Sequence, residues 1–145
     1  MSPPRTFTAF VSLCALALGA APFGTAAQGV PLGVFEWRTL NGRPAPAEFP
    51  PRSGMQLIRG SLELTPATSD TEARFELVLH VSIAGAAATP NSVAGSFTSE
   101  GDMLRFLPDR GDAGAPVTFR YAWLPDGTLA LTDAIRHVWG YERLD

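Results

Sequence analysis

The feature that most constrains the fold is an alternation of apolar and polar side chains with a period of two. It runs through most of the chain after residue 27, where no window of a dozen residues carries an apolar stripe at helical spacing. In the clearest stretch, 73–83, one face holds Phe75, Leu77, Leu79, Val81 and Ile83, and the other holds Arg74, Glu76, His80 and Ser82. This pattern predicts antiparallel strands with one buried face.

Eight segments carry this signal. The stretches 117–123 and 128–132, joined by a turn at 125–127, form the clearest hairpin. The other segments are 34–40, 55–64 with Gly60 as the expected bend or bulge, 73–83, 92–98, 103–107 and 135–142. Their connections are mostly short, and a sheet of this size should close because closure removes exposed edges. The sequence therefore predicts an all-β, eight-stranded antiparallel up-and-down barrel, with a β-sandwich as the alternative.

The first 27 residues have the pattern of a signal peptide. Arg5 precedes a run without charged side chains at 7–21, and small residues fill 24–27. The run is shorter than the roughly 20 residues that a membrane-spanning helix needs. We expect cleavage near Ala27, export to the periplasm or out of the cell, and no membrane span in the mature chain. Residues 28–145 should then form a single domain.

Charge and motifs argue against several functions. The net charge is −3 and all 11 basic residues are arginine, without the basic patch that nucleic-acid binding needs. The two histidines, His80 and His137, are too few for a metal site. Asp133 precedes His137 by four residues, a spacing that separates side chains on a strand. No nucleophile motif is present. We expect no catalytic residues, no metal and no cofactor.

A proline-rich segment at 41–53 is too rich in proline for a strand and stiff enough to hold one path. It could cover a barrel mouth as a lid with Phe49 turned inward, or simply plug the barrel end. The stretch 109–116 is the other long connection.

Aromatic side chains on the expected inward faces suggest two states of the lumen. An eight-stranded barrel is either filled by side chains or holds one small ligand, and this many rings favours filling. If a pocket exists, the candidate ligand-binding residues are Trp37, Phe49, Phe75, Tyr121 and Trp123.

The stretch Gly33-Val34-Phe35-Glu36-Trp37 resembles the glycine-aromatic opening of lipocalins. Lipocalins place a tryptophan two residues after the glycine, where this chain has Phe35, and Trp37 follows one pleat later. In that family an arginine from the end of the barrel packs on the tryptophan, a part that Arg143 or Arg136 could play.

The stretches 41–46 and 141–143 are also similar to small exported lipocalin-like proteins of bacteria. The resemblance implies a barrel with an apolar lumen but no particular ligand.

Two functions fit these observations. The first is an exported, non-enzymatic barrel that binds or sequesters a small hydrophobic ligand in its lumen. The alternative is a solid-cored exported interaction module, such as an inhibitor or an envelope assembly factor, that contacts a partner protein through residues 41–53.

Overall fold

The computed structural model describes residues 29–109 and 115–145, and the regular structure in these ranges is all β-strand. The expected leader and the centre of the 109–116 connection lie outside the described residues. The strands are β1 (Gly33–Leu40), β2 (Arg43–Pro44), β3 (Ala47–Glu48), β4 (Met55–Thr65), β5 (Arg74–Ile83), β6 (Thr89–Glu100), β7 (Met103–Pro108), β8 (Val117–Trp123), β9 (Leu129–Thr132) and β10 (Val138–Arg143).

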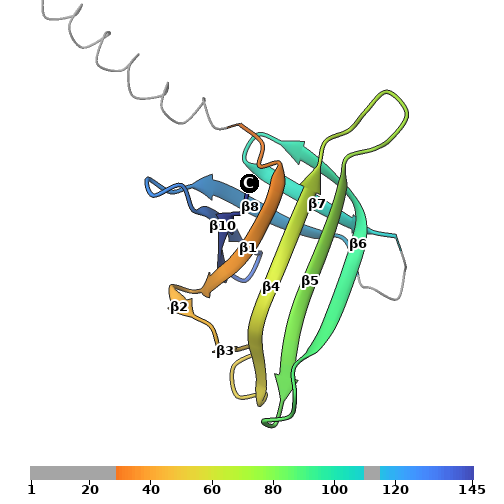
Figure 1. Cartoon of the computed structure of the whole chain (residues 1–145). Helices are drawn as coiled ribbons and strands as arrows, with labels where there is room; N and C mark the ends of the chain where they lie inside the picture. The colour runs from red at the N-terminus through yellow and green to blue at the C-terminus, as the bar shows by residue number, and fades with distance from the viewer. Residues whose placement is uncertain (1–28, 110–114) are drawn as a thin grey trace, which may run out of the picture.

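Eight of these strands form a closed ring (Figure 1). Strands β4 to β10 pair antiparallel in chain order, and β1 closes the ring by pairing with both β10 and β4. The short strands β2 and β3 lie outside the ring, on β1 and β4 respectively. The predicted up-and-down barrel is confirmed, and the sandwich is excluded because one continuous sheet holds every described strand.

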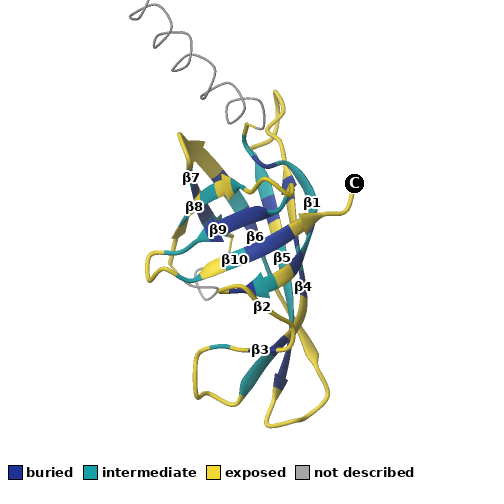
Figure 2. Ribbon diagram, turned by 90° about the vertical axis from the view of Figure 1, so that its left-hand side faces the viewer, coloured by how far each residue is buried: buried dark blue, intermediate teal, exposed yellow. Residues whose placement is uncertain are grey.

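Each predicted segment overlaps one strand of the ring, because the alternation places its apolar side chains toward the lumen. Figure 2 shows β9 buried over most of its length and β10 buried in its middle. The largest fully buried side chains include Phe35, Leu64, Leu104 and Leu129, from four different strands. The core is therefore the interior of the ring.

Two strands contain an extra residue that changes which side chains face inward. The register of β1 shifts between Trp37 and Thr39, so that both Trp37 and Leu40 are buried. The register of β4 shifts between Leu57 and Arg59. The expected irregularity at Gly60 is thus wrong in position, since Gly60 lies past the bulge and pairs regularly with Leu79. These bulges bend their strands, which helps a sheet to close.

The end of the barrel where β1 starts and β10 finishes is closed by Arg143. Its guanidinium carbon lies 5.4 Å from the ring centre of Phe35 and 5.3 Å from that of Trp123. Its Nη2 atom donates a hydrogen bond of 2.9 Å to the carbonyl oxygen of Leu32. The expected arginine stack therefore exists, but on Phe35 and Trp123 rather than on Trp37. Arg136 lies instead in the exposed turn before β10.

We expect Arg143→Ala to lower the free energy of unfolding by about 1–3 kcal/mol, because it removes two cation–π contacts and a charge-assisted hydrogen bond. Urea unfolding followed by tryptophan fluorescence measures this loss. Arg120→Ala is the control, since Arg120 is an exposed residue whose ion pair with Asp102 spans 3.4 Å. Equal stability of the two variants would show that the stack does not brace this end.

The proline-rich segment pairs with the ring through two short strands. Pro44 pairs with Thr39 of β1, and Ala47 pairs with Leu57 of β4. The prediction that it forms no strand is wrong for these two short stretches, because the extended backbone of a proline-rich chain suits the edge of a sheet.

Candidate functional site

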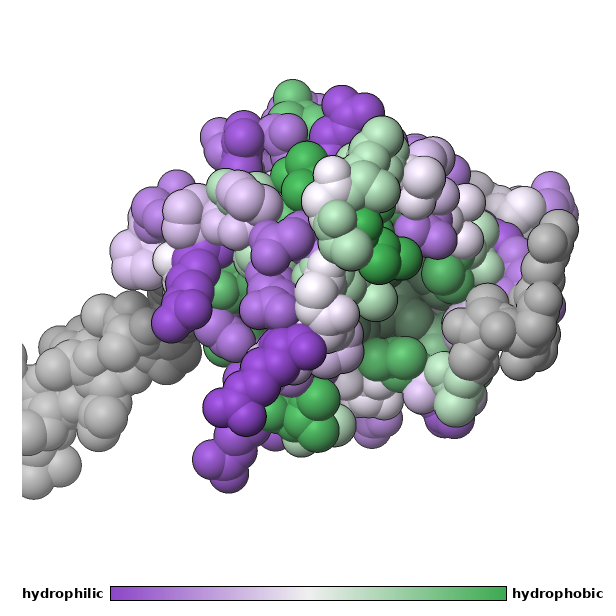
Figure 3. All heavy atoms as spheres, turned by 90° about the horizontal axis from the view of Figure 1, so that it is seen from below, coloured by the Kyte–Doolittle hydropathy of each residue, from purple (hydrophilic) through white to green (hydrophobic). Residues whose placement is uncertain are grey.

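The barrel contains an apolar cavity of about 160 Å³. It is lined by residues from seven strands of the ring: Leu62, Phe75, Leu77, Val93, Phe106, Pro108, Val117, Phe119, Leu131 and Tyr141. Its mouth lies at the end where β7 finishes and β8 begins, since Pro108 and the 43 % exposed Val117 belong to the lining. Figure 3 shows a hollow with apolar side chains around it on the face seen from below.

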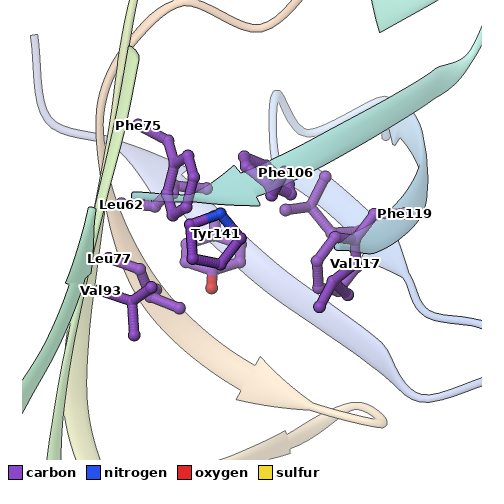
Figure 4. A pocket seen from close by; sticks show the side chains of 10 residues that line it. Leu62, Phe75, Leu77, Val93, Phe106, Val117, Phe119 and Tyr141 are labelled. Atoms are coloured by element: carbon purple, nitrogen blue, oxygen red, sulfur yellow. The ribbon is translucent and has the colours of Figure 1, made fainter. Parts of the chain in front are cut away.

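Aromatic rings form one wall of the cavity. The ring centres of Phe75 and Phe106 are 4.8 Å apart, and those of Phe106 and Phe119 are 5.5 Å apart, both pairs at 74°. Such edge-to-face contacts are favourable and hold the rings in fixed positions. Figure 4 shows the aliphatic side chains of Leu77 and Val93 across the space from Val117 and Phe119. The cavity is thus bordered by aromatic rings and by aliphatic side chains.

Tyr141 brings the one polar side chain among the described lining residues. It is 4 % exposed, and burial raises the pKa of its hydroxyl above its ordinary range, so the hydroxyl is protonated at neutral pH. No side-chain N or O atom sealed from solvent lacks a hydrogen-bond partner within the described residues. The Oη atom of Tyr141 makes none of the hydrogen bonds between those residues, so it faces open space. Figure 4 shows this oxygen pointing into the cavity.

Of the five predicted ligand-binding residues, Phe75 lines this cavity and the other four lie elsewhere. The indole N–H of Trp37 donates to the Thr39 carbonyl at 2.7 Å, and that of Trp123 donates to the Gly29 carbonyl at 3.1 Å. The Tyr121 hydroxyl donates to the Gly101 carbonyl at 3.0 Å. The polar atoms that suggested a role in ligand orientation are therefore used within the protein.

Phe49 lies against the start of β10, outside the cavity lining. Its ring centre is 5.0 Å from that of His137 and 5.2 Å from that of Trp139, in edge-to-face geometry. It is partly buried and packs against the core, as an inward-turned residue of the proline-rich segment should. No residue of 41–53 lines the cavity, so the segment does not cover this pocket as a lid.

The five residues predicted to bind a ligand do not include Tyr141, although its inward position was detectable. Tyr141 lies on the inward face of the last strand, where its pairing partners are Trp37 and Leu129. The missing information was which inward hydroxyl would find a partner. The Tyr121 hydroxyl donates to the carbonyl oxygen of Gly101, in the turn between β6 and β7, whereas the Tyr141 hydroxyl meets no such carbonyl. This difference depends on the three-dimensional path of the chain.

Asp133 and His137 are in contact, contrary to the expectation from their spacing. His137 Nδ1 lies 3.2 Å from Asp133 Oδ2, and the His137 backbone N–H donates to Asp133 Oδ1 at 2.8 Å. The indole N–H of Trp139 donates to Asp133 Oδ2 at 3.3 Å. The reason is that 133–137 forms a turn and β10 begins at Val138, whereas the predicted strand began at residue 135.

This turn gives the stability a dependence on acid pH. Desolvation would raise the pKa of Asp133, but hydrogen bonds from the His137 backbone, Trp139 and the His137 ring outweigh it and lower that pKa. A carboxyl with a lowered folded-state pKa stabilises the fold above its unfolded pKa of about 3.9. This contribution is lost as the pH falls below that value and through the folded-state pKa.

We therefore expect Asp133→Asn to lower the free energy of unfolding at pH 7 by about 1–3 kcal/mol, since an amide N–H₂ would face the donors of Trp139 and His137. The difference from wild type should shrink below about pH 4. Chemical denaturation at several pH values measures both effects. Asp126→Asn is the control, because an asparagine oxygen can still accept the Thr128 N–H at the exposed turn. A pH-independent difference would contradict the account.

The described residues contain no group of three or more His, Cys, Asp or Glu side chains that could hold a metal ion. In residues 29–109 and 115–145, no helix is long and apolar enough to span a membrane. Comparison of the chain with protein-family models, with curated proteins and with solved structures found no match. The geometry of the lumen is therefore what supports a function.

Proposed function

We propose that this protein is an exported, non-enzymatic barrel that binds or sequesters one small hydrophobic molecule in its lumen. The observation that carries the proposal is the apolar cavity of about 160 Å³ inside the ring. Side chains that filled the lumen completely would leave no such space. Export rests on the leader-like pattern of residues 1–27. The stack of Arg143 on Phe35 supports the lipocalin-like character implied by the first strand.

The volume limits the size of the ligand. Pockets for drug-sized molecules usually measure about 300–1,000 Å³. An apolar cavity of about 150 Å³ in another protein holds benzene or xenon. A cavity of about 160 Å³ therefore suits a molecule with one ring or a short branched chain. A long fatty acid or a polycyclic ligand would need the mouth to widen.

The chemistry of the lining favours binding over catalysis. General acid–base catalysis needs groups whose pKa values lie near the working pH. Tyr141 is the one titratable side chain in the described lining, and burial moves its pKa away from neutrality. Apolar walls with one fixed donor instead favour retention of a neutral molecule.

Two measurements test the proposal. Native mass spectrometry of protein purified from its own host should show a fraction carrying one small molecule. Titration with toluene should shift the methyl NMR signals of Leu77, Val93 and Leu131, while the signal of the exposed Ile135 stays in place. A barrel that is always empty and shows no shift at millimolar toluene would refute ligand binding in the lumen.

The alternative role, a partner-binding module acting through residues 41–53, calls for a different experiment. Ala47 is buried and Phe49 packs against the core, so deletion of the segment would also damage the barrel. Arg43 and Arg52 are exposed and can be changed to alanine without loss of these contacts. A pull-down partner lost from both variants, together with an empty lumen, would favour this alternative.

A further inference from the structure

The Tyr141 hydroxyl is placed to recognise a ligand. Most buried polar side chains in proteins have a hydrogen-bond partner, and an unpaired buried hydroxyl costs free energy. Tyr141 is 4 % exposed, faces nine apolar lining residues and makes no hydrogen bond among the described residues. Figure 4 shows its oxygen in the space between Leu77 and Val93 on one side and Val117 on the other. Since no sealed side-chain N or O atom of the described residues lacks a partner, the Oη atom is reached from the open space of the cavity, where a ligand can accept its hydrogen bond.

Water that enters through the mouth is a poor partner for this hydroxyl. A buried water usually makes about three hydrogen bonds. Here Tyr141 brings one polar side chain and the rest of the described lining is apolar. A ligand atom held in place by the walls would satisfy the hydroxyl without needing further polar partners.

The protonated state of Tyr141 sets the chemistry of that atom. Because burial raises the pKa of the hydroxyl, Tyr141 presents an O–H donor throughout the physiological range. A charged acceptor such as a carboxylate would lose its hydration and gain only one hydrogen bond, which is unfavourable. A neutral oxygen avoids this cost.

We propose that the natural ligand is a neutral molecule of about one ring that carries an oxygen acceptor, and that Tyr141 Oη donates a hydrogen bond to this oxygen. Aromatic ketones, aldehydes and esters of small size belong to this class. The inference rests on the proposed function, since it assigns the chemistry of a ligand in the same cavity. It also makes Tyr141 the residue that distinguishes such a ligand from a plain hydrocarbon.

The test uses two probes of nearly the same shape, acetophenone and α-methylstyrene. Acetophenone has a carbonyl oxygen at the position where α-methylstyrene has a methylene group. Calorimetry or methyl NMR gives the Kd of each for the full mature chain. We expect Tyr141→Phe to weaken acetophenone binding roughly tenfold, the effect of one lost hydrogen bond, and to leave α-methylstyrene unchanged. Tyr121→Phe is the matched control and should change neither Kd, because Tyr121 does not line the cavity.

A direct signal comes from the tyrosines themselves, since the chain has two. With ¹³Cζ-labelled tyrosine, acetophenone should shift the Tyr141 signal and α-methylstyrene should not. If both probes bind and Tyr141→Phe weakens neither or both equally, with no carbonyl-specific shift, the role of Tyr141 is refuted while lumen binding stands. If neither probe binds to the wild type, the proposed function fails and this inference fails with it.

Discussion

Replacing Gly95 with alanine should lower the free energy of unfolding by about 3 kcal/mol or more, the upper range for overpacking of a core. A Cβ atom at Gly95 would lie 2.0 Å from the Leu107 carbonyl oxygen and 2.8 Å from Cε1 of Phe75. The first atom belongs to the backbone of β7, so the contact can be relieved only by separating β6 from β7. Urea unfolding monitored by circular dichroism measures the loss.

Two other substitutions serve as controls for Gly95→Ala. Ala94→Val should have little effect, because the Ala94 side chain is exposed and valine suits a strand. Gly60→Ala should cost less than Gly95→Ala, because its nearest contact is the flexible tip of Leu79 at 2.7 Å. A Gly95→Ala variant as stable as wild type would mean that β6 and β7 do not approach this closely in solution.

Replacing Val93 with tryptophan should abolish ligand binding in the lumen, with at least a hundredfold rise in the Kd for toluene, equivalent to about 2.7 kcal/mol. Val93 lines the cavity, and the larger indole would occupy the space that the ligand needs. Because the cavity already exists, the new side chain has room and the barrel should remain folded. Methyl NMR titration gives the Kd, and thermal unfolding checks the fold.

Ser92→Trp is the matched control for Val93→Trp. Ser92 is the preceding residue on β6 and is exposed, because successive side chains of a strand point to opposite faces. This variant adds the same indole outside the barrel and should bind toluene as the wild type does. Equal binding by both variants would place the ligand site outside the lumen.

The ring of strands was predictable because it depends on a property that each strand carries by itself. On β5, the alternation of Phe75, Leu77 and Leu79 with Arg74 and Glu76 fixes one buried face without reference to any other strand. Short connections then restrict the pairing to neighbours along the chain. Closure follows because a ring leaves fewer exposed edges.

The bulges and the turn before β10 were not predictable, because they depend on contacts beyond the single strand. The bulges after Trp37 and after Leu57 depend on how two paired strands bend together, and a single strand carries no signal for them. The contact between Asp133 and His137 depends on β10 beginning three residues later than its alternation suggests. In that case the local pattern of 135–137 was outweighed by a hydrogen-bonded turn.

The cavity lay beyond prediction from sequence because it is a small difference between two large volumes. Counting aromatic residues gives the volume of the side chains, but the volume enclosed by the ring depends on the stagger and tilt of its strands. Phe35 and Trp37 fill space near β1, while Phe75, Phe106 and Phe119 stack against one another and leave a gap beside Tyr141. One part of the lumen is thus filled by side chains, and another part is open.

Diffraction from a crystal held under xenon pressure shows whether the lumen contains an accessible apolar cavity. Xenon enters apolar cavities of this size, and the experiment does not require the natural ligand to be known. We expect a xenon site inside the ring, bordered by Phe75, Val93 and Tyr141, which is absent from Val93→Trp crystals. A lumen that excludes xenon, with these side chains in contact across the space, would contradict this expectation.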